Sequence, residues 1–169
     1  MPKILIAIDG SELALDAVRH ALDLVRAGLR AEFVLANVQE PASLYELVVS
    51  RDPDRIAAAS LEAGAHLMAG ARALLEAAGQ SYETEIGMGD PANTLVDLIE
   101  NTQSDMAIIG ARGQGALSGA LLGSVSQALA HASPVPVTIV RHAAPQIEAE
   151  DLQEDGGAAD ALEGFRGGV

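Results

Sequence analysis

The sequence has no cysteine and no tryptophan, and only two tyrosines and two phenylalanines among its 169 residues. Without cysteine the chain has no disulfide bond, no thiolate nucleophile and no cysteine-ligated zinc or iron–sulfur centre. So few aromatic side chains also argue against a protein that stacks on nucleic-acid bases. The hydrophobic residues make up 49% of the chain and are mostly aliphatic. They therefore suit the packing of helices on a sheet.

Basic residues are scarce as well. Ten lysines and arginines stand against 24 aspartates and glutamates, which gives a formal net charge of −14. This acidity disfavours nucleic acid and anionic membrane surfaces as partners. No apolar run approaches the length of a membrane span, and the run before Asp9 is too short for the core of a signal peptide. We therefore expect a cytoplasmic protein with one folded domain and no membrane insertion.

Strand-like and helix-like segments alternate along most of the chain. Short, continuous apolar runs rich in β-branched residues are typical of strands that are buried on both faces of a parallel sheet. The expected strands are Lys3–Ile8, Glu32–Val38, Tyr82–Ile86, Asp105–Ile109 and Val135–Arg141. The segments between them are amphipathic with helical spacing, so the chain is predicted to be an α/β protein with right-handed crossovers and helices on both faces of the sheet.

Polar residues and glycines mark the ends of the predicted helices. The second helix is expected to be long and unbroken. The predicted helix boundaries are Ser11 to Gly28, Asp52-Pro53 to Gly79, a start at Asp90-Pro91, and a start at the S-x-x-Q capping box of Ser124 and Gln127.

The loop after the fourth strand, Gly110 to Ser126, holds five glycines and three serines. Ligands of open α/β sheets bind beyond the carboxyl ends of the strands, where the strand order reverses. If the first and fourth strands are neighbours, Asp9 and this loop share one cleft. The helix that begins at Ser124 would present free N–H groups and a positive dipole end to an anion.

Two common phosphate-binding patterns are absent from this loop. It contains no G-x-x-x-x-G-K-[ST], and the G-x-G that starts at Gly113 is not completed, because position 118 is a serine. The only lysine of the chain, Lys3, begins the first strand and so lies at the opposite pole of the sheet. Backbone N–H groups, Ser124, Ser126 and Arg112 would therefore have to hold a phosphate.

The loop does match the spacing G-x-x-G, nine residues, G-[ST], at Gly110, Gly113 and Gly123-Ser124. With this spacing the chain resembles the universal stress protein family, in the subset that binds ATP. Further segments agree in order over residues 1–142: IAIDGS at 6–11, GDPA at 89–92, IIGARGQG at 108–115, and GSVSQ followed by SPVPVTIVR to Arg141.

The resemblance implies a three-layer α/β/α, doubly wound sheet of five parallel strands in the order 3-2-1-4-5, the adenine nucleotide alpha hydrolase-like fold. It also implies ATP as the ligand, with Mg²⁺ carried by the nucleotide; AMP and ADP are alternatives, because the nine-residue insert has no basic residue. No catalytic residue and no metal ligand of the protein is expected. The implied nucleotide contacts are Ala7, Ile8, Asp9, Val38, Ile109, Gly110, Arg112, Gly113, Gly123, Ser124, Val125 and Ser126.

The family resemblance further implies a regulatory, stress-response homodimer that pairs through Val135–Val140 and acts on an unidentified protein partner. Two other functions stay open, an interaction module that needs no nucleotide and a slow ATPase. Asp9 and Ser124 also have ordinary explanations, as a turn residue and a helix cap. Residues 143–169 contain seven acidic residues and one arginine, and are expected to form a mobile acidic tail beyond the nucleotide-binding domain.

Overall fold

The computed structural model describes residues 1–41, 53–113 and 122–141, so the predicted acidic tail lies outside the described residues. The strands form one five-stranded parallel sheet in the order β3-β2-β1-β4-β5. The predicted fold class and strand order are therefore confirmed. The strands are β1 (Lys3–Ala7), β2 (Glu32–Gln39), β3 (Tyr82–Met88), β4 (Met106–Gly110) and β5 (Val137–Val140).

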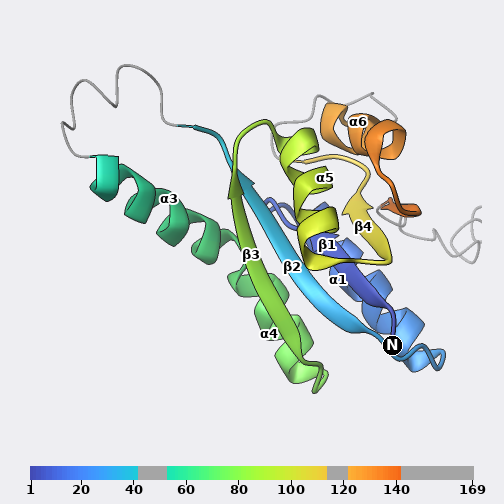
Figure 1. The fold of residues 1–169 in the computed structure, drawn as a ribbon. Helices are drawn as coiled ribbons and strands as arrows, with labels where there is room; N and C mark the ends of the chain where they lie inside the picture. Colours follow the sequence, from blue (N-terminus) through green and yellow to red (C-terminus); the bar gives the residue numbers. More distant parts are fainter. Residues whose placement is uncertain (42–52, 114–121, 142–169) are drawn as a thin grey trace, which may run out of the picture.

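Helices cover both faces of the sheet (Figure 1). One face packs against α1 and α4, and the other packs against α5 and α6. The helices are α1 (Glu12–Arg26), α3 (Pro53–Leu67), α4 (Ala69–Ala77), α5 (Pro91–Thr102) and α6 (Ser124–Ala132).

The central strands are apolar on both faces because each face has its own core. On β1, Ile4 and Ile6 are fully buried toward α1 and α4, while Leu5 is fully buried toward α5 and α6. On β2, Phe33 and Val34 divide between the two cores in the same way. Burying each large aliphatic side chain contributes roughly 1.5–3 kcal/mol, so both layers hold the sheet in place.

The predicted starts of α1 and α5 are confirmed. The Ser11 Oγ accepts the Ala14 N–H at 3.2 Å, and an Asp90 carboxylate oxygen accepts the Asn93 N–H at 3.0 Å. After α1, Gly28 takes a φ of +105°, which L side chains rarely adopt.

The predicted single helix from Pro53 to Gly79 is wrong. The chain bends at Met68, which has a φ of −84° and a ψ of −5°, and this divides the segment into α3 and α4. The Met68 side chain, at the junction of the two helices, is buried in the core that α1 and α4 form with the sheet, so tertiary packing fixes the bend. The alanine-rich sequence favours helix on either side of it and gives no local sign of a break. As a result, the N-terminal part of α3 projects away from the sheet, while its C-terminal part lies beside β2 and β3 (Figure 1).

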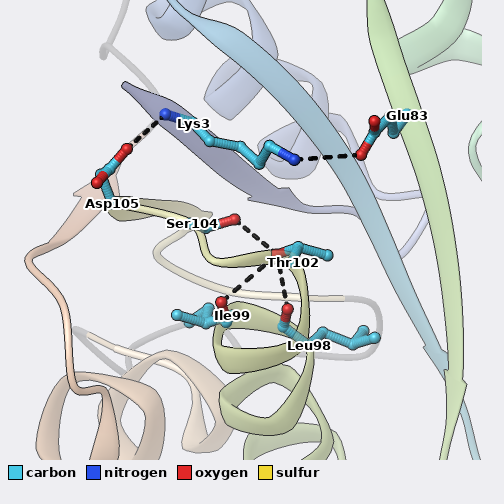
Figure 2. A network of polar contacts seen from close by, with 7 residues as sticks. All are labelled: Lys3, Glu83, Leu98, Ile99, Thr102, Ser104 and Asp105. Atoms are coloured by element: carbon cyan, nitrogen blue, oxygen red, sulfur yellow. Dashed lines mark hydrogen bonds and ion pairs between the residues drawn. The ribbon is translucent and has the colours of Figure 1, made fainter. Parts of the chain in front are cut away.

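The amino-terminal pole of the sheet is held by polar contacts (Figure 2). The Lys3 main-chain N–H donates to an Asp105 carboxylate oxygen at 2.7 Å, and the Lys3 Nζ lies 3.5 Å from a carboxylate oxygen of Glu83. Close by, the hydroxyls of Thr102 and Ser104 are 2.8 Å apart. Lys3 thus forms its contacts at the pole opposite the carboxyl ends of the strands, as expected.

Candidate functional site

A cleft of about 580 Å³ lies at the carboxyl ends of β1, β2 and β4. The strand β1 has β2 as its neighbour on one side and β4 on the other, and the chain proceeds from β1 toward opposite edges of the sheet. The cleft therefore lies where the strand order reverses. Its volume is in the range of small-molecule sites. All the residues singled out from the sequence line it: Ala7, Ile8, Asp9, Val38, Ile109, Gly110, Arg112, Gly113, Gly123, Ser124, Val125 and Ser126. That these residues contact a nucleotide stays a prediction.

Asp9 stands directly after β1 and is oriented by the start of α1. One of its carboxylate oxygens, Oδ1, accepts the Ser11 N–H at 2.9 Å and the Ser11 Oγ–H at 2.6 Å. The other oxygen, Oδ2, faces the loop after β4, because a Cβ built on Gly113 would lie only 2.4 Å from it. The structure therefore brings the carboxylate and the glycine loop together across the cleft.

The three motif glycines have different reasons to be glycine. At Gly110 a Cβ would come within 2.8 Å of the Leu13 carbonyl oxygen, so the close approach of α1 excludes a side chain. At Gly113 the Asp9 carboxylate occupies that space. At Gly123 the nearest atom to a built Cβ is the Arg112 Cα at 3.4 Å, which is an ordinary contact. The packing of the described residues therefore does not require glycine at position 123.

The start of α6 opens into the same cleft. Gly123 is the N-cap, with a φ of −75° and a ψ of 160°, and no side chain of the described residues caps the helix. The predicted capping box is therefore wrong, and Ser124 is the first helical residue. The reason is that the Gly123 N–H donates to the Ala111 carbonyl at 2.7 Å, which holds Gly123 in the extended N-cap conformation. The helix therefore starts one residue earlier than a cap at Ser124 would place it. The first N–H groups of α6 have no acceptor within the helix and form its positive end.

Ser126 ties the helix start to the end of β4. Its side chain is buried, and its Oγ lies 3.0 Å from the Ala111 carbonyl oxygen and 2.9 Å from the Gly123 carbonyl oxygen. The single hydroxyl proton is therefore directed at the protein backbone, so toward a ligand this oxygen can act only as an acceptor. Ser124, by contrast, has an exposed side chain at the mouth of the cleft.

The opposite end of the cleft is formed by β2, where sequence reasoning missed Asn37. This residue is only 2% exposed, and its Nδ2 donates to the Ile8 carbonyl at 2.7 Å. Its Oδ1 accepts from the Gln39 Nε2 at 2.6 Å. The signal that could have found it is a lone amide within the apolar strand sequence FVLANV. Other lining residues that were missed are Ala14, Ala36, Glu40, Leu67, Pro91, Leu95 and Leu122.

Among the residues that the structure describes, the charged ones in the cleft lining are Asp9, Glu40 and Arg112. One guanidinium and one helix N-terminus are thus available to an anion, while Asp9 can accept hydrogen bonds from hydroxyl groups. Within residues 1–41, 53–113 and 122–141, no group of three or more histidine, aspartate or glutamate side chains could hold a metal ion. In that part of the chain, no helix is both long and apolar enough to cross a membrane.

The fold and cleft define a doubly wound α/β protein with a ligand site at the switch point of its sheet. The family model described as the Universal stress protein family matches residues 1–141, and the chain belongs to this family. A universal stress protein of Methanocaldococcus jannaschii is 28% identical over 139 residues, which cover 82% of this chain and 81% of that protein.

Solved structures share the fold. The structure of hypothetical protein MJ0577 superimposes with a TM-score of 0.72 and 26% identity, and covers 85% of this chain and 97% of its own. A universal stress protein crystallised in complex with cAMP gives a TM-score of 0.55 and 26% identity, and covers 82% of this chain and 95% of its own. The adenine nucleotide alpha hydrolase-like fold of these proteins is thus also the fold of this chain.

Proposed function

We propose that this protein is a cytoplasmic regulatory protein that binds an adenine nucleotide between the ends of β1 and β4. The observation that carries the proposal is the N-terminus of α6, which lines the same cleft of about 580 Å³ as the Asp9 carboxylate. A related universal stress protein with 26% identity was crystallised with cAMP, which supports an adenine nucleotide as the class of ligand.

The phosphates would bind at the start of α6. Main-chain N–H groups of Ser124, Val125 and Ser126 supply donors there, and the helix dipole favours negative charge. The backbone of Gly123 would allow close approach of a phosphate, because glycine itself carries no side chain. Among the described residues of the lining, Arg112 is the only basic one, and the sequence of segment 114–121 contains no basic residue. ATP with Mg²⁺ is the first ligand to test, and AMP and ADP, which carry less charge, follow.

The ribose and base would occupy the rest of the cleft. The Asp9 carboxylate is a strong acceptor for ribose hydroxyls, since a charged acceptor forms stronger hydrogen bonds than a neutral one. The base would lie on the apolar surface of Ala7, Ile8 and Ile109, with main-chain contacts at Val38. Any Mg²⁺ would arrive with the phosphates and would be held mainly by them.

Titration calorimetry with ATP–Mg²⁺ and with AMP tests the proposal. We expect binding by the unmodified protein and a loss of about tenfold or more in affinity in Gly123→Ala, because the methyl group occupies the space of a phosphate. Gly70→Ala is the matched control: this helical glycine lies on α4, where a Cβ would meet a Leu15 side chain at 3.3 Å. No heat from folded protein at millimolar nucleotide would refute the function.

We also propose that the protein is a homodimer that pairs through β5. The two edges of the sheet differ in charge: β3 carries Glu83 and Glu85, whereas β5 is Val-Thr-Ile-Val. Charges on an edge strand oppose pairing with another chain, and an uncharged edge permits it. Sedimentation should give a dimer for the unmodified protein and a monomer for Thr138→Lys. A monomer in both would refute the dimer without touching the nucleotide site.

A further inference from the structure

The hydrogen-bond ladder between β1 and β2 opens beside the cleft. The Ile8 N–H still donates to the Ala36 carbonyl at 2.8 Å. Main-chain groups of successive strand residues point alternately to the two neighbouring strands, so Ala36 and Val38 both direct their N–H and C=O toward β1. The hydrogen bond of the next residue agrees with this alternation: the Gln39 carbonyl points away from β1, toward the chain that follows β3, and accepts the Gly89 N–H at 3.0 Å.

The next rung of this ladder would be a bond from the Val38 N–H to the Ile8 carbonyl. In the part of the chain that the structure describes, that bond is not formed. The side-chain Nδ2 of Asn37 donates to the Ile8 carbonyl instead, at 2.7 Å. Asn37 thus satisfies the last carbonyl of β1, and the main-chain N–H and C=O of Val38 are left facing the cleft that Val38 lines.

Asn37 is held firmly in this position. Its side chain is 2% exposed, and its Oδ1 accepts from the Gln39 Nε2 at 2.6 Å. From the side of α3, the backbone of Gly64 packs so closely that a Cβ there would lie 2.8 Å from the Asn37 Oδ1. The amide therefore has little freedom to turn away from Ile8.

We propose that Asn37 is a positioning residue that keeps the β1–β2 ladder open, presents the Val38 N–H and C=O to the base, and so selects 6-aminopurines over 6-oxopurines. This inference rests on the proposed nucleotide site. Adenine carries an acceptor, N1, beside an amino donor, which complements one N–H and one C=O. Hypoxanthine carries an N1–H donor beside an acceptor oxygen, so its donor would face the Val38 N–H and its acceptor would face the Val38 C=O, and neither pair could form a hydrogen bond. Buried polar groups left unpaired in this way discriminate strongly between ligands.

Titrations with AMP and IMP test the proposal on the full chain. We expect the unmodified protein to prefer AMP by about tenfold or more, and Asn37→Leu to lose about tenfold in AMP affinity with little change for IMP. Asn37→Asp, which keeps the side-chain size but replaces the donor with an acceptor, should act in the same direction. Ser104→Ala, which removes a buried hydroxyl at the opposite pole, is the control and should leave the AMP to IMP ratio unchanged.

Hydrogen exchange of the Val38 amide, followed by NMR, separates a positioning role from a structural one. In the nucleotide-free protein this amide should exchange rapidly and become protected by AMP. In Asn37→Leu it should be protected without nucleotide, because the Val38 N–H then takes the Ile8 carbonyl. Slow exchange in the unmodified protein, or an unchanged AMP to IMP ratio in both Asn37 variants, overturns the role of Asn37. If the unmodified protein binds neither AMP nor IMP, the same comparison is made with ATP and ITP, and if ATP does not bind either, the proposed function fails as well.

Discussion

Replacing Gly110 with alanine should destabilise the fold even in the absence of any ligand. The added Cβ would lie 2.8 Å from the carbonyl oxygen and 2.9 Å from the carbonyl carbon of Leu13, well inside the usual contact distance of about 3.5–4.0 Å. Both are backbone atoms of α1, so neither can turn away as a side chain would. Either β4 or α1 must shift, and overpacking of this kind costs about 1–3 kcal/mol.

A small opposing effect comes from the unfolded chain. Alanine has less conformational freedom than glycine in the unfolded state, which stabilises a compatible site by about 0.4–1 kcal/mol. Taking the middle of each range, about 2 kcal/mol less about 0.7 kcal/mol, the net loss in the free energy of unfolding for Gly110→Ala should be about 1.3 kcal/mol. Gly123→Ala meets only ordinary contacts, the closest at 3.4 Å, so its unfolding free energy should stay within about 0.5 kcal/mol of the unmodified protein.

Urea denaturation without nucleotide measures both values. The two glycines belong to one sequence motif but have different roles in the structure. Gly110 allows α1 to pack closely against β4, and Gly123 leaves space in the cleft. Equal stability of Gly110→Ala and the unmodified protein would show that α1 does not approach β4 as described. A loss of about 2 kcal/mol or more in Gly123→Ala would contradict the reasoning on the other glycine.

Three further predictions concern side chains. Asp9→Ala should lower the unfolding free energy by about 1 kcal/mol because Ser11 loses its acceptor, whereas Asp9→Asn keeps an acceptor oxygen and should mainly weaken nucleotide binding in calorimetry. Ser126→Ala should cost about 1–2 kcal/mol in urea denaturation, because the hydroxyl bridging β4 and α6 is lost. The hydrogen bond from the Tyr82 hydroxyl to the Glu76 carboxylate raises the pKa of Tyr82 above its ordinary value of about 10. Its stabilising effect is therefore complete below about pH 10 and is lost as the pH rises through the raised value. Denaturation at increasing alkaline pH should show this fall, and Tyr82→Phe should lack it.

Much of the fold follows from local sequence signals. Continuous apolar runs indicated buried parallel strands, and Ser11 and Asp90 marked helix starts that the structure confirms. The bend at Met68 could not be foreseen in this way, because it depends on the burial of the Met68 side chain in the core that α1 and α4 form with the sheet. The start of α6 was misplaced by one residue for a similar reason, since a backbone hydrogen bond to Ala111, distant in sequence, decides it.

The candidate site, like the fold, was predicted where local sequence signals determine it and missed where contacts between distant segments do. A motif with fixed spacing pointed to the glycine loop, and strand order then placed it beside Asp9. Nothing in that motif distinguishes Gly110, which is required by packing, from Gly123, which is not. Asn37 was missed because its importance lies in a bond to Ile8, a residue of the neighbouring strand. Such contacts emerge only when strands from different parts of the chain are aligned.

The most direct measurement of the central claim is a crystal structure of the protein grown with an adenine nucleotide. We predict the base beside the main chain of Val38, the ribose hydroxyls on the Asp9 carboxylate, and the phosphates at the first N–H groups of α6. A nucleotide bound elsewhere, or a cleft between β1 and β4 that stays without nucleotide at saturating concentration, would contradict the account.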